Sequence, residues 1–351
     1  MRAILLSCLA ATGAAQARPP IRLVLEYSID DAAGVSFGTI NRLELGPDGS
    51  VAAVDGANGV IYRFTPAGRL RDSLGHRGQG PGEFQIAAGL GVGPGGEVAL
   101  ADLRTRRLTI WEPDGRLRGS TQLTGMPVDL LWRGADPVVG VVSFGDPVMI
   151  RFGIGRLGDN VISGELGGFP DPRIAEYPSA VSCGTCRHAL TPAGKLLVAA
   201  PDTFYRVSEL DAAGKPVRTW RRSEVGAGLR TPEELAALRR RLAAGPGDGR
   251  PLPGMEARFR APDDEALKYR PRTQGIGIDS KGRLIALVSN SGRPWPVVDV
   301  FAGDGGFLGT VVPERPLETL VVRGTRVAAL SETPEGIPTI LVYRIEEVPP
   351  R

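Results

Sequence analysis

Short runs of alternating hydrophobic and polar residues, separated by turns rich in Gly and Pro, follow one another along most of this chain. The clearest run is LELGPDGSVAAVDGANGVIYRFTPAGRLRDSL, which begins at Leu43. Alternation with a period of two places apolar side chains on one face of a strand, and the Pro-Asp-Gly and Pro-Ala-Gly triplets are typical of tight turns. The pattern predicts four short strands in this segment and an all-β chain.

The same pattern recurs 47 residues later, in LGVGPGGEVALADLRTRRLTIWEPDGRLRGST from Leu90. The residues that recur without change include Gly46, Pro47, Gly49, Val51, Ala52, Asp55, Pro66, Gly68, Arg69, Leu70 and Arg71. Four short strands in about 40 to 50 residues is the repeat of a β-propeller blade.

Weaker copies follow at residues 127–157, Leu190–Trp220, Ile276–Val311 and Leu317–Ile345. The available length holds six repeats of 47 residues and a separate insertion, but not seven repeats. We therefore predict a six-bladed β-propeller of four-stranded antiparallel blades. The strand-like segment Ile21–Ile29 precedes the first repeat, so we expect it to pair with the last blade and close the ring.

Residues 223–270 lack strand periodicity and are predicted to be a helical and loop insertion after the fourth blade. Within it, Thr231 is a candidate helix N-cap, with Pro232 at the first helical position, Glu234 completing a capping box and Gly245 beyond the end. Residues 18–351 are otherwise expected to be one propeller domain.

The first 17 residues, MRAILLSCLAATGAAQA, have the order of a cleavable secretory signal: a positive start, an apolar run and small residues ending at Ala17. We expect cleavage after Ala17 and a periplasmic or secreted protein. The alternative is a lipoprotein attached through Cys8, although the apolar run before that residue is short. No later segment is apolar for the roughly 20 residues that a membrane-spanning helix needs.

Charge does not identify a partner, because the formal net charge is only +3 despite a sequence pI near 8.9. The mixed basic and aromatic segment Arg218-Thr-Trp-Arg-Arg222 is expected to be a solvated outer strand and not a nucleic-acid surface. We predict no nucleic-acid partner, no membrane span and a monomer.

The stretch from Leu74 to Val92, LGHRGQGPGEFQIAAGLGV, together with ALADLRTRRLTIWEPDGRL, resembles the NHL repeat of six-bladed propellers. Gly82-Glu83-Phe84, Gly96, Asp102 and Trp111 fit the family pattern, whereas the Asn of the Asp-led turn is Asn58 in one copy and Thr105 in the other. The resemblance implies a propeller but no single activity, because such propellers include enzymes and binding scaffolds. Phe84 is expected to lie between two blades.

Cys183-Gly-Thr-Cys186-Arg-His188 does not have the Cys-x-x-Cys-His spacing of haem attachment. A zinc site would need further soft ligands, and the only other His is His76. We predict a local disulfide between Cys183 and Cys186, with a redox role as the alternative.

Asp55 and Asp102 recur once per repeat, so we expect them to hold turns by accepting backbone N–H groups, with a metal or acid/base role as the alternative. Calcium lactonase propellers use Glu, Asp and Asn in their channel, which leaves Asn41, Asn58, Asn160 and Asn290 as formal candidates. Zinc lyase propellers of the NHL type use several histidines, and this chain has two.

In a propeller, the Asp-led turns and the blade-to-blade connections open on the same face. Our hypothesis is a non-catalytic recognition scaffold that binds a protein, peptide or glycan there without a cofactor. The alternative is a metal-dependent hydrolase or lyase, lactonase-like, with calcium or another ion in the central channel. The candidate ligand residues are Asp55, Asn58, His76, Arg77, Glu83, Asp102, Arg104, Arg106, Arg187, His188 and Trp295.

Overall fold

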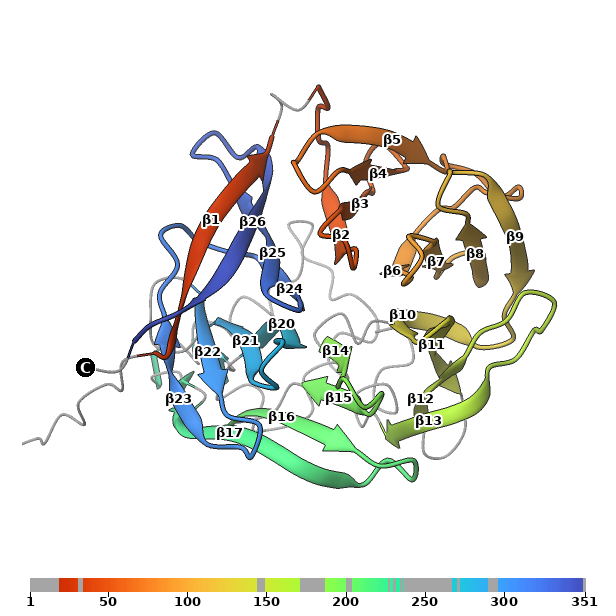
Figure 1. Cartoon of the computed structure of the whole chain (residues 1–351). Coiled ribbons are helices and arrows are strands. Elements are labelled where there is room, and N and C mark those ends of the chain that lie inside the picture. The colour runs from red at the N-terminus through yellow and green to blue at the C-terminus, as the bar shows by residue number, and fades with distance from the viewer. Residues whose placement is uncertain are drawn as a thin grey trace, which may run out of the picture.

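The computed structural model describes residues 19–30, 34–143, 149–170, 187–199, 204–226, 228–229, 232–233, 236, 267–269, 272–289 and 296–349. Within these ranges, six four-stranded antiparallel sheets surround a central axis (Figure 1). The predicted six-bladed propeller is confirmed. The expected signal sequence and both cysteines of the predicted disulfide lie outside the described residues.

The blades follow chain order, and the first strand of each lies nearest the axis (Figure 1). Blade 1 contains β2 (Ile40–Leu45), β3 (Val51–Asp55), β4 (Val60–Phe64) and β5 (Leu70–Leu74). Blade 2 contains β6 (Ala87–Val92), β7 (Val98–Asp102), β8 (Arg107–Trp111) and β9 (Leu117–Gln122). Blade 3 contains β10 (Met126–Arg133), β11 (Asp136–Ser143), β12 (Met149–Ile154) and β13 (Ser163–Pro170), so this less regular repeat still forms four strands.

The second half of the ring repeats the arrangement. Blade 4 contains β14 (Arg187–Leu190), β15 (Leu196–Ala199), β16 (Phe204–Leu210) and β17 (Pro216–Gly226). Blade 5 contains β20 (Arg272–Ile278), β21 (Leu284–Ser289), β22 (Val297–Phe301) and β23 (Phe307–Val311). Blade 6 contains β24 (Thr319–Arg323), β25 (Arg326–Glu332), β26 (Pro338–Glu347) and β1 (Ile21–Ile29).

The N-terminal strand closes the ring. β1 pairs antiparallel with β26, from Ile21 opposite Glu347 to Ile29 opposite Ile340, and forms the outer strand of blade 6. One sheet therefore contains strands from both ends of the described chain, and β1 covers the edge of β26 that would otherwise be unpaired. The expected pairing of Ile21–Ile29 with the last blade is confirmed.

The expected insertion contains strand at both ends. β17 continues past Ser223 to Gly226, and β18 (Gly228–Leu229) pairs with β19 (Leu267–Tyr269). Expecting only helix and loop over 223–270 was wrong at these ends, because backbone pairing forms there without apolar alternation. Pro232, Glu233 and Ala236 are helical, and the rest of the predicted helix lies outside the described residues.

Neighbouring blades pack through large side chains between their sheets. Phe84 is 1% exposed and belongs to a cluster that includes Val54 and Leu74 of blade 1 and Leu90 and Leu100 of blade 2. The expected position of Phe84 between two blades is confirmed.

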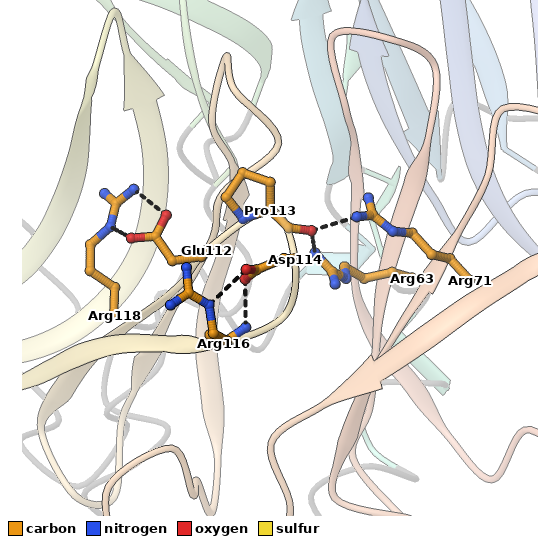
Figure 2. A network of polar contacts seen from close by, with 7 residues as sticks. All are labelled: Arg63, Arg71, Glu112, Pro113, Asp114, Arg116 and Arg118. Carbon is orange, nitrogen blue, oxygen red and sulfur yellow. Dashed lines mark hydrogen bonds and ion pairs between the residues drawn. The ribbon is translucent and has the colours of Figure 1, made fainter.

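Blades 1 and 2 are also joined by polar contacts (Figure 2). Arg63 and Arg71 from blade 1 both donate to the carbonyl of Pro113 in the β8–β9 turn of blade 2. Arg63 is held in place by a bidentate contact with Asp72. Charge-assisted hydrogen bonds of this kind fix the angle between two sheets as well as their distance.

Among the described residues, no helix has the length and apolar character needed to cross a membrane.

Candidate ligand-binding face and central channel

The loop face is the side of the propeller on which the second strand of each blade ends and the first strand begins. It carries the β3–β4 turn of blade 1, the β7–β8 turn of blade 2 and the connection from β5 to β6. The two turns start at Asp55 and Asp102, 47 residues apart in the sequence.

Asp55 is fully buried beneath the loop face, and its carboxylate accepts several N–H groups. Oδ2 accepts from Gly38 N at 2.7 Å and from the Asn58 side-chain amide at 2.8 Å. Oδ1 accepts from the backbone N–H groups of Thr39, Ala57 and Asn58. Burial raises the pKa of Asp55, but these hydrogen bonds outweigh it and the net pKa lies below its ordinary value.

Asp102 repeats this arrangement in blade 2 at 1% exposure. Its Oδ2 accepts from Gln85 N at 2.8 Å, and its Oδ1 accepts from Ile86 N at 3.1 Å and Arg104 N at 2.8 Å. The expected turn-holding role of Asp55 and Asp102 is confirmed. Both carboxylates, which were also named among the candidate ligand residues, are buried and occupied by N–H groups of the fold.

The glycine-rich loop between β5 and β6 folds around Glu83. The Glu83 carboxylate accepts from Gly80 N at 2.7 Å and contacts His76 Nε2 at 2.8 Å. The hydrogen bond from Gly80 and the contact with His76 lower the pKa of Glu83. Arg77 donates to the carbonyls of Gly56 and Ala57 in the blade 1 turn. These three candidates lie at the loop face and stabilise the loop itself.

The remaining candidates differ in accessibility. Asn58 is exposed but donates to Asp55 and to the Ser36 carbonyl. Arg104 and Arg106 are exposed, and within the described residues neither guanidinium has a hydrogen bond or an ion pair. Trp295 lies outside the described residues.

His188 was expected at the surface, and its side chain is instead only 2% exposed. Its Nδ1 lies 2.7 Å from Asp129 Oδ2, and its ring lies 4.7 Å from that of Phe152. Its Nε2 has no hydrogen-bond partner among the described residues. The ring therefore joins blades 3 and 4. Arg187, one residue earlier, is partly exposed and lines the central cavity.

The central channel is a cavity of about 930 Å³ lined by the first strands of all six blades. Four of these strands, β2, β6, β10 and β20, contain a register shift near their start. A β-bulge re-aims the next side chain. The residues that follow the four shifts are equivalent in position, and they are Arg42, Gly89, Asp129 and Gly275.

The channel arginines are used in contacts between blades. Arg42 donates to the carbonyl of Ala88 on β6 at 2.8 Å. Arg323 on β24 donates to the carbonyls of Leu45 on β2 and Val92 on β6, at 2.7 and 2.9 Å. Burial lowers the pKa of both arginines. These cross-links connect blades 6, 1 and 2 around the axis.

Glu44 lies in the same channel, and burial raises its pKa to about 8 in spite of the nearby Arg323. It is therefore mostly protonated at pH 7 and offers little negative charge to a cation. Within the described ranges, no three His, Cys, Asp or Glu side chains are grouped closely enough to hold a metal ion.

The three described asparagines among those considered for a calcium site do not meet in the channel. Asn41 lines the cavity, and Asn58 holds the blade 1 turn. Asn160 lies on the β12–β13 connection, where its carbonyl accepts from Thr124 N. Asn290 lies outside the described residues.

Sequence reasoning missed the channel residues Arg42, Glu44, Asp129 and Arg323. A signal for the first two existed in the repeat, because the positions 47 residues later are Gly89 and Gly91. Where one copy of the repeat has a charged residue and the other has a glycine at the equivalent position, the two blades differ in the contacts they make.

No family model matches this chain, and no curated protein matches it. The resemblance to NHL repeats therefore stays a prediction. A Bacteroides fragilis protein assigned as exported is similar in structure, with 10% identity, 94% of this chain and 95% of that chain covered, and a TM-score of 0.52. The WD40 repeats of RRP9 show 11% identity, 94% and 100% coverage and a TM-score of 0.50. A protein assigned as a gluconolactonase shows 14% identity, 95% and 99% coverage and a TM-score of 0.49. At these identities, the similarities to the Bacteroides fragilis protein and to RRP9 show the propeller fold alone.

Proposed function

We propose that this chain is an exported, non-catalytic recognition scaffold that binds a protein, peptide or glycan ligand on its loop face. The observation that carries the proposal is the pair of exposed arginines, Arg104 and Arg106, which no described contact of the fold uses. An exposed guanidinium on a rigid turn is a ready ligand group for an anion.

The contacts made by charged residues in the channel support a structural role for those residues. Arg42 and Arg323 are hydrogen-bonded to neighbouring strands, and Asp129 contacts His188. A catalytic site needs polar groups that converge on a reacting atom. The charges named here converge instead on the protein backbone or on one another, which supports placing recognition on the loop face.

Export is supported by the signal-like sequence that ends at Ala17. The ligand would then be met in the periplasm or outside the cell.

Selection from peptide and glycan libraries tests the proposal. The mature protein should enrich ligands that bind saturably and that compete with one another for one site. Metal analysis of the same preparation tests the alternative, a metal-dependent enzyme. A stoichiometric, tightly held calcium or zinc ion, together with failure to select any ligand, would overturn the scaffold and favour a hydrolase or lyase.

A further inference from the structure

The turns of blades 1 and 2 share their frame and differ in their exposed residues. Both are held by a buried aspartate that accepts backbone N–H groups from the turn and from the preceding connection. Blade 1 has Ala57, Gly59 and Val60 where blade 2 has Arg104, Arg106 and Arg107. One copy of a shared conformation therefore carries three positive charges that the other copy lacks.

Arg106 occupies a conformation that suits glycine. Its φ is +51°, and it is the one non-glycine residue with a positive φ among those the structure describes. The equivalent Gly59 has a φ of +71° and has no Cβ to be strained. Backbone strain of this kind persists where something else requires the side chain, and it is most common at functional sites.

Arg107 shows what a structural arginine does in the same turn. Its guanidinium donates to the carbonyls of Gln79 and Gly80, which fastens the β5–β6 connection to the turn. Arg104 and Arg106 have no such contact within the described chain, and both are exposed. The turn is thus held rigid by Asp102 and Arg107 while the other two guanidinium groups are available. A rigid site loses little entropy when a ligand binds.

Apolar side chains lie directly beside these charges. Ile86 is 46% exposed, and its carbonyl accepts from Leu103 N at 2.8 Å, which places the two residues next to each other. Both line the central cavity. The nearby carboxylate of Glu83 is occupied by Gly80 N and His76.

Guanidinium groups bind carboxylate and phosphate groups, whereas an apolar contact needs an apolar side chain on the ligand. A sulfated glycan or a polyphosphate supplies the charge alone. A peptide with acidic and apolar residues side by side supplies both kinds of group within a short distance. The adjacent arginines and apolar residues therefore favour a peptide.

We propose that the blade 2 turn anchors an acidic peptide segment of a partner protein. Carboxylates of the peptide pair with Arg104 and Arg106, and an apolar side chain of the peptide packs on Ile86 and Leu103. This inference rests on the proposed recognition function and specifies the chemistry of the ligand and the blade that binds it.

The test uses the variant Arg104→Ala/Arg106→Gly, which gives blade 2 the residues that blade 1 has at these positions. The probe is a fluorescein-labelled peptide of alternating Glu and Leu, measured by anisotropy. We expect affinity to fall about tenfold or more, since exposed arginines that anchor a ligand are common hot spots. The thermal midpoint should stay the same or rise, because Arg106→Gly removes backbone strain.

The control is Arg69→Ala/Arg116→Ala, which removes the same charge from the opposite face, where the third and fourth strands of blades 1 and 2 are joined. Its affinity should match the wild type. Equal affinity in both double variants would overturn the inference and leave the scaffold proposal standing. The single variant Arg104→Ala, at a position with ordinary backbone, serves the same comparison if the double variant does not fold.

Further probes identify the ligand class. A Gln-Leu peptide and a Glu-Ser peptide should both bind more weakly than the Glu-Leu peptide. Heparin that binds more tightly than the peptide and displaces it would overturn the choice of a peptide. If no probe binds but the library selection yields other ligands, this inference falls and the proposed function stands; if the selection also fails, both fall.

Discussion

In the central channel, Arg42 and Arg323 donate to backbone carbonyls of neighbouring inner strands, whereas on the loop face Arg104 and Arg106 extend from a turn without a described partner. The difference comes from the surroundings. Inner strands approach one another closely enough for a long side chain to cross between blades. On the exposed blade 2 turn, Arg107 donates to the carbonyl of Gln79, whereas the guanidinium groups of Arg104 and Arg106 donate to no carbonyl within the described residues.

The pKa values of the buried carboxylates also differ between the loop face and the channel. Asp55 accepts several N–H groups at the loop face and has a lowered pKa. Glu44 in the channel has a pKa raised to about 8, because burial outweighs the help of Arg323 and a single backbone hydrogen bond. On the loop face, N–H donors fix the buried carboxylate of Asp55, while the guanidinium groups of Arg104 and Arg106 have no hydrogen bond within the described residues. In the channel, Arg42 and Arg323 are fixed by carbonyls, while burial keeps Glu44 protonated.

The largest expected effect is at the buried acid of the loop face. Asp55→Asn places an amide NH₂ among backbone N–H donors, so we expect a loss of about 3 to 4 kcal/mol in the free energy of unfolding, measured by urea denaturation at pH 7. The control Asp48→Asn removes an exposed carboxylate that accepts from Ser50 N, and it should cost less than about 1 kcal/mol.

The sign of the pH dependence follows from the lowered pKa of Asp55. A carboxyl with a lowered pKa stabilises the fold above its unfolded-state value near 3.8, and that contribution disappears as the pH falls through the folded-state pKa. The difference between wild type and Asp55→Asn should therefore shrink in strong acid. Equal costs for Asp55→Asn and Asp48→Asn would contradict the turn-holding role.

The next effect separates the two arginine environments. Arg323→Ala removes two hydrogen bonds that join β24 to β2 and β6, and we expect a loss of about 2 to 3 kcal/mol in the free energy of unfolding. Arg104→Ala should change it by less than about 0.5 kcal/mol. Both values come from the same denaturant titration. Similar losses for the two variants would remove the distinction between channel and loop face.

Glu44 gives the channel its own pH dependence. In the folded protein Glu44 keeps its proton up to about pH 8, while the unfolded chain releases it near the ordinary value of 4.5. Between these values the folded state binds more protons, so stability falls as the pH rises. Glu44→Gln should remove this slope, which we expect to be on the order of 1 to 2 kcal/mol between pH 5 and pH 8 because the channel is partly open to solvent.

The measurement is the denaturation midpoint of both proteins at several pH values. Glu335→Gln changes an exposed carboxyl and should follow the wild-type curve. Parallel curves for wild type and Glu44→Gln would show that Glu44 titrates as it does in water.

Features that depend on local alternation or on a recurring residue could be predicted from the sequence. The 47-residue repeat located the blades and the turn-holding role of Asp55, and local alternation located the closing strand Ile21–Ile29. Burial of His188 depends on Phe152 and Asp129, which are distant in sequence, so no local pattern could place it. The channel role of Arg323 likewise depends on strands from blades 1 and 2.

The smallest effect tests the strain in the blade 2 turn. Arg106→Gly relieves a positive φ, which costs a non-glycine residue about 1 kcal/mol or more, but it also gives the unfolded chain more freedom. We expect a net gain of about 0.5 kcal/mol in the free energy of unfolding. The comparison is Arg104→Gly, which relieves no strain and only gives the unfolded chain more freedom, so it should lose stability. The reciprocal change Gly59→Arg in blade 1 should destabilise, since a Cβ there would lie 2.8 Å from the Cβ of Arg77. If Arg106→Gly loses as much stability as Arg104→Gly, the side chain of Arg106 contributes to folding, and its value to a ligand can no longer be inferred from strain.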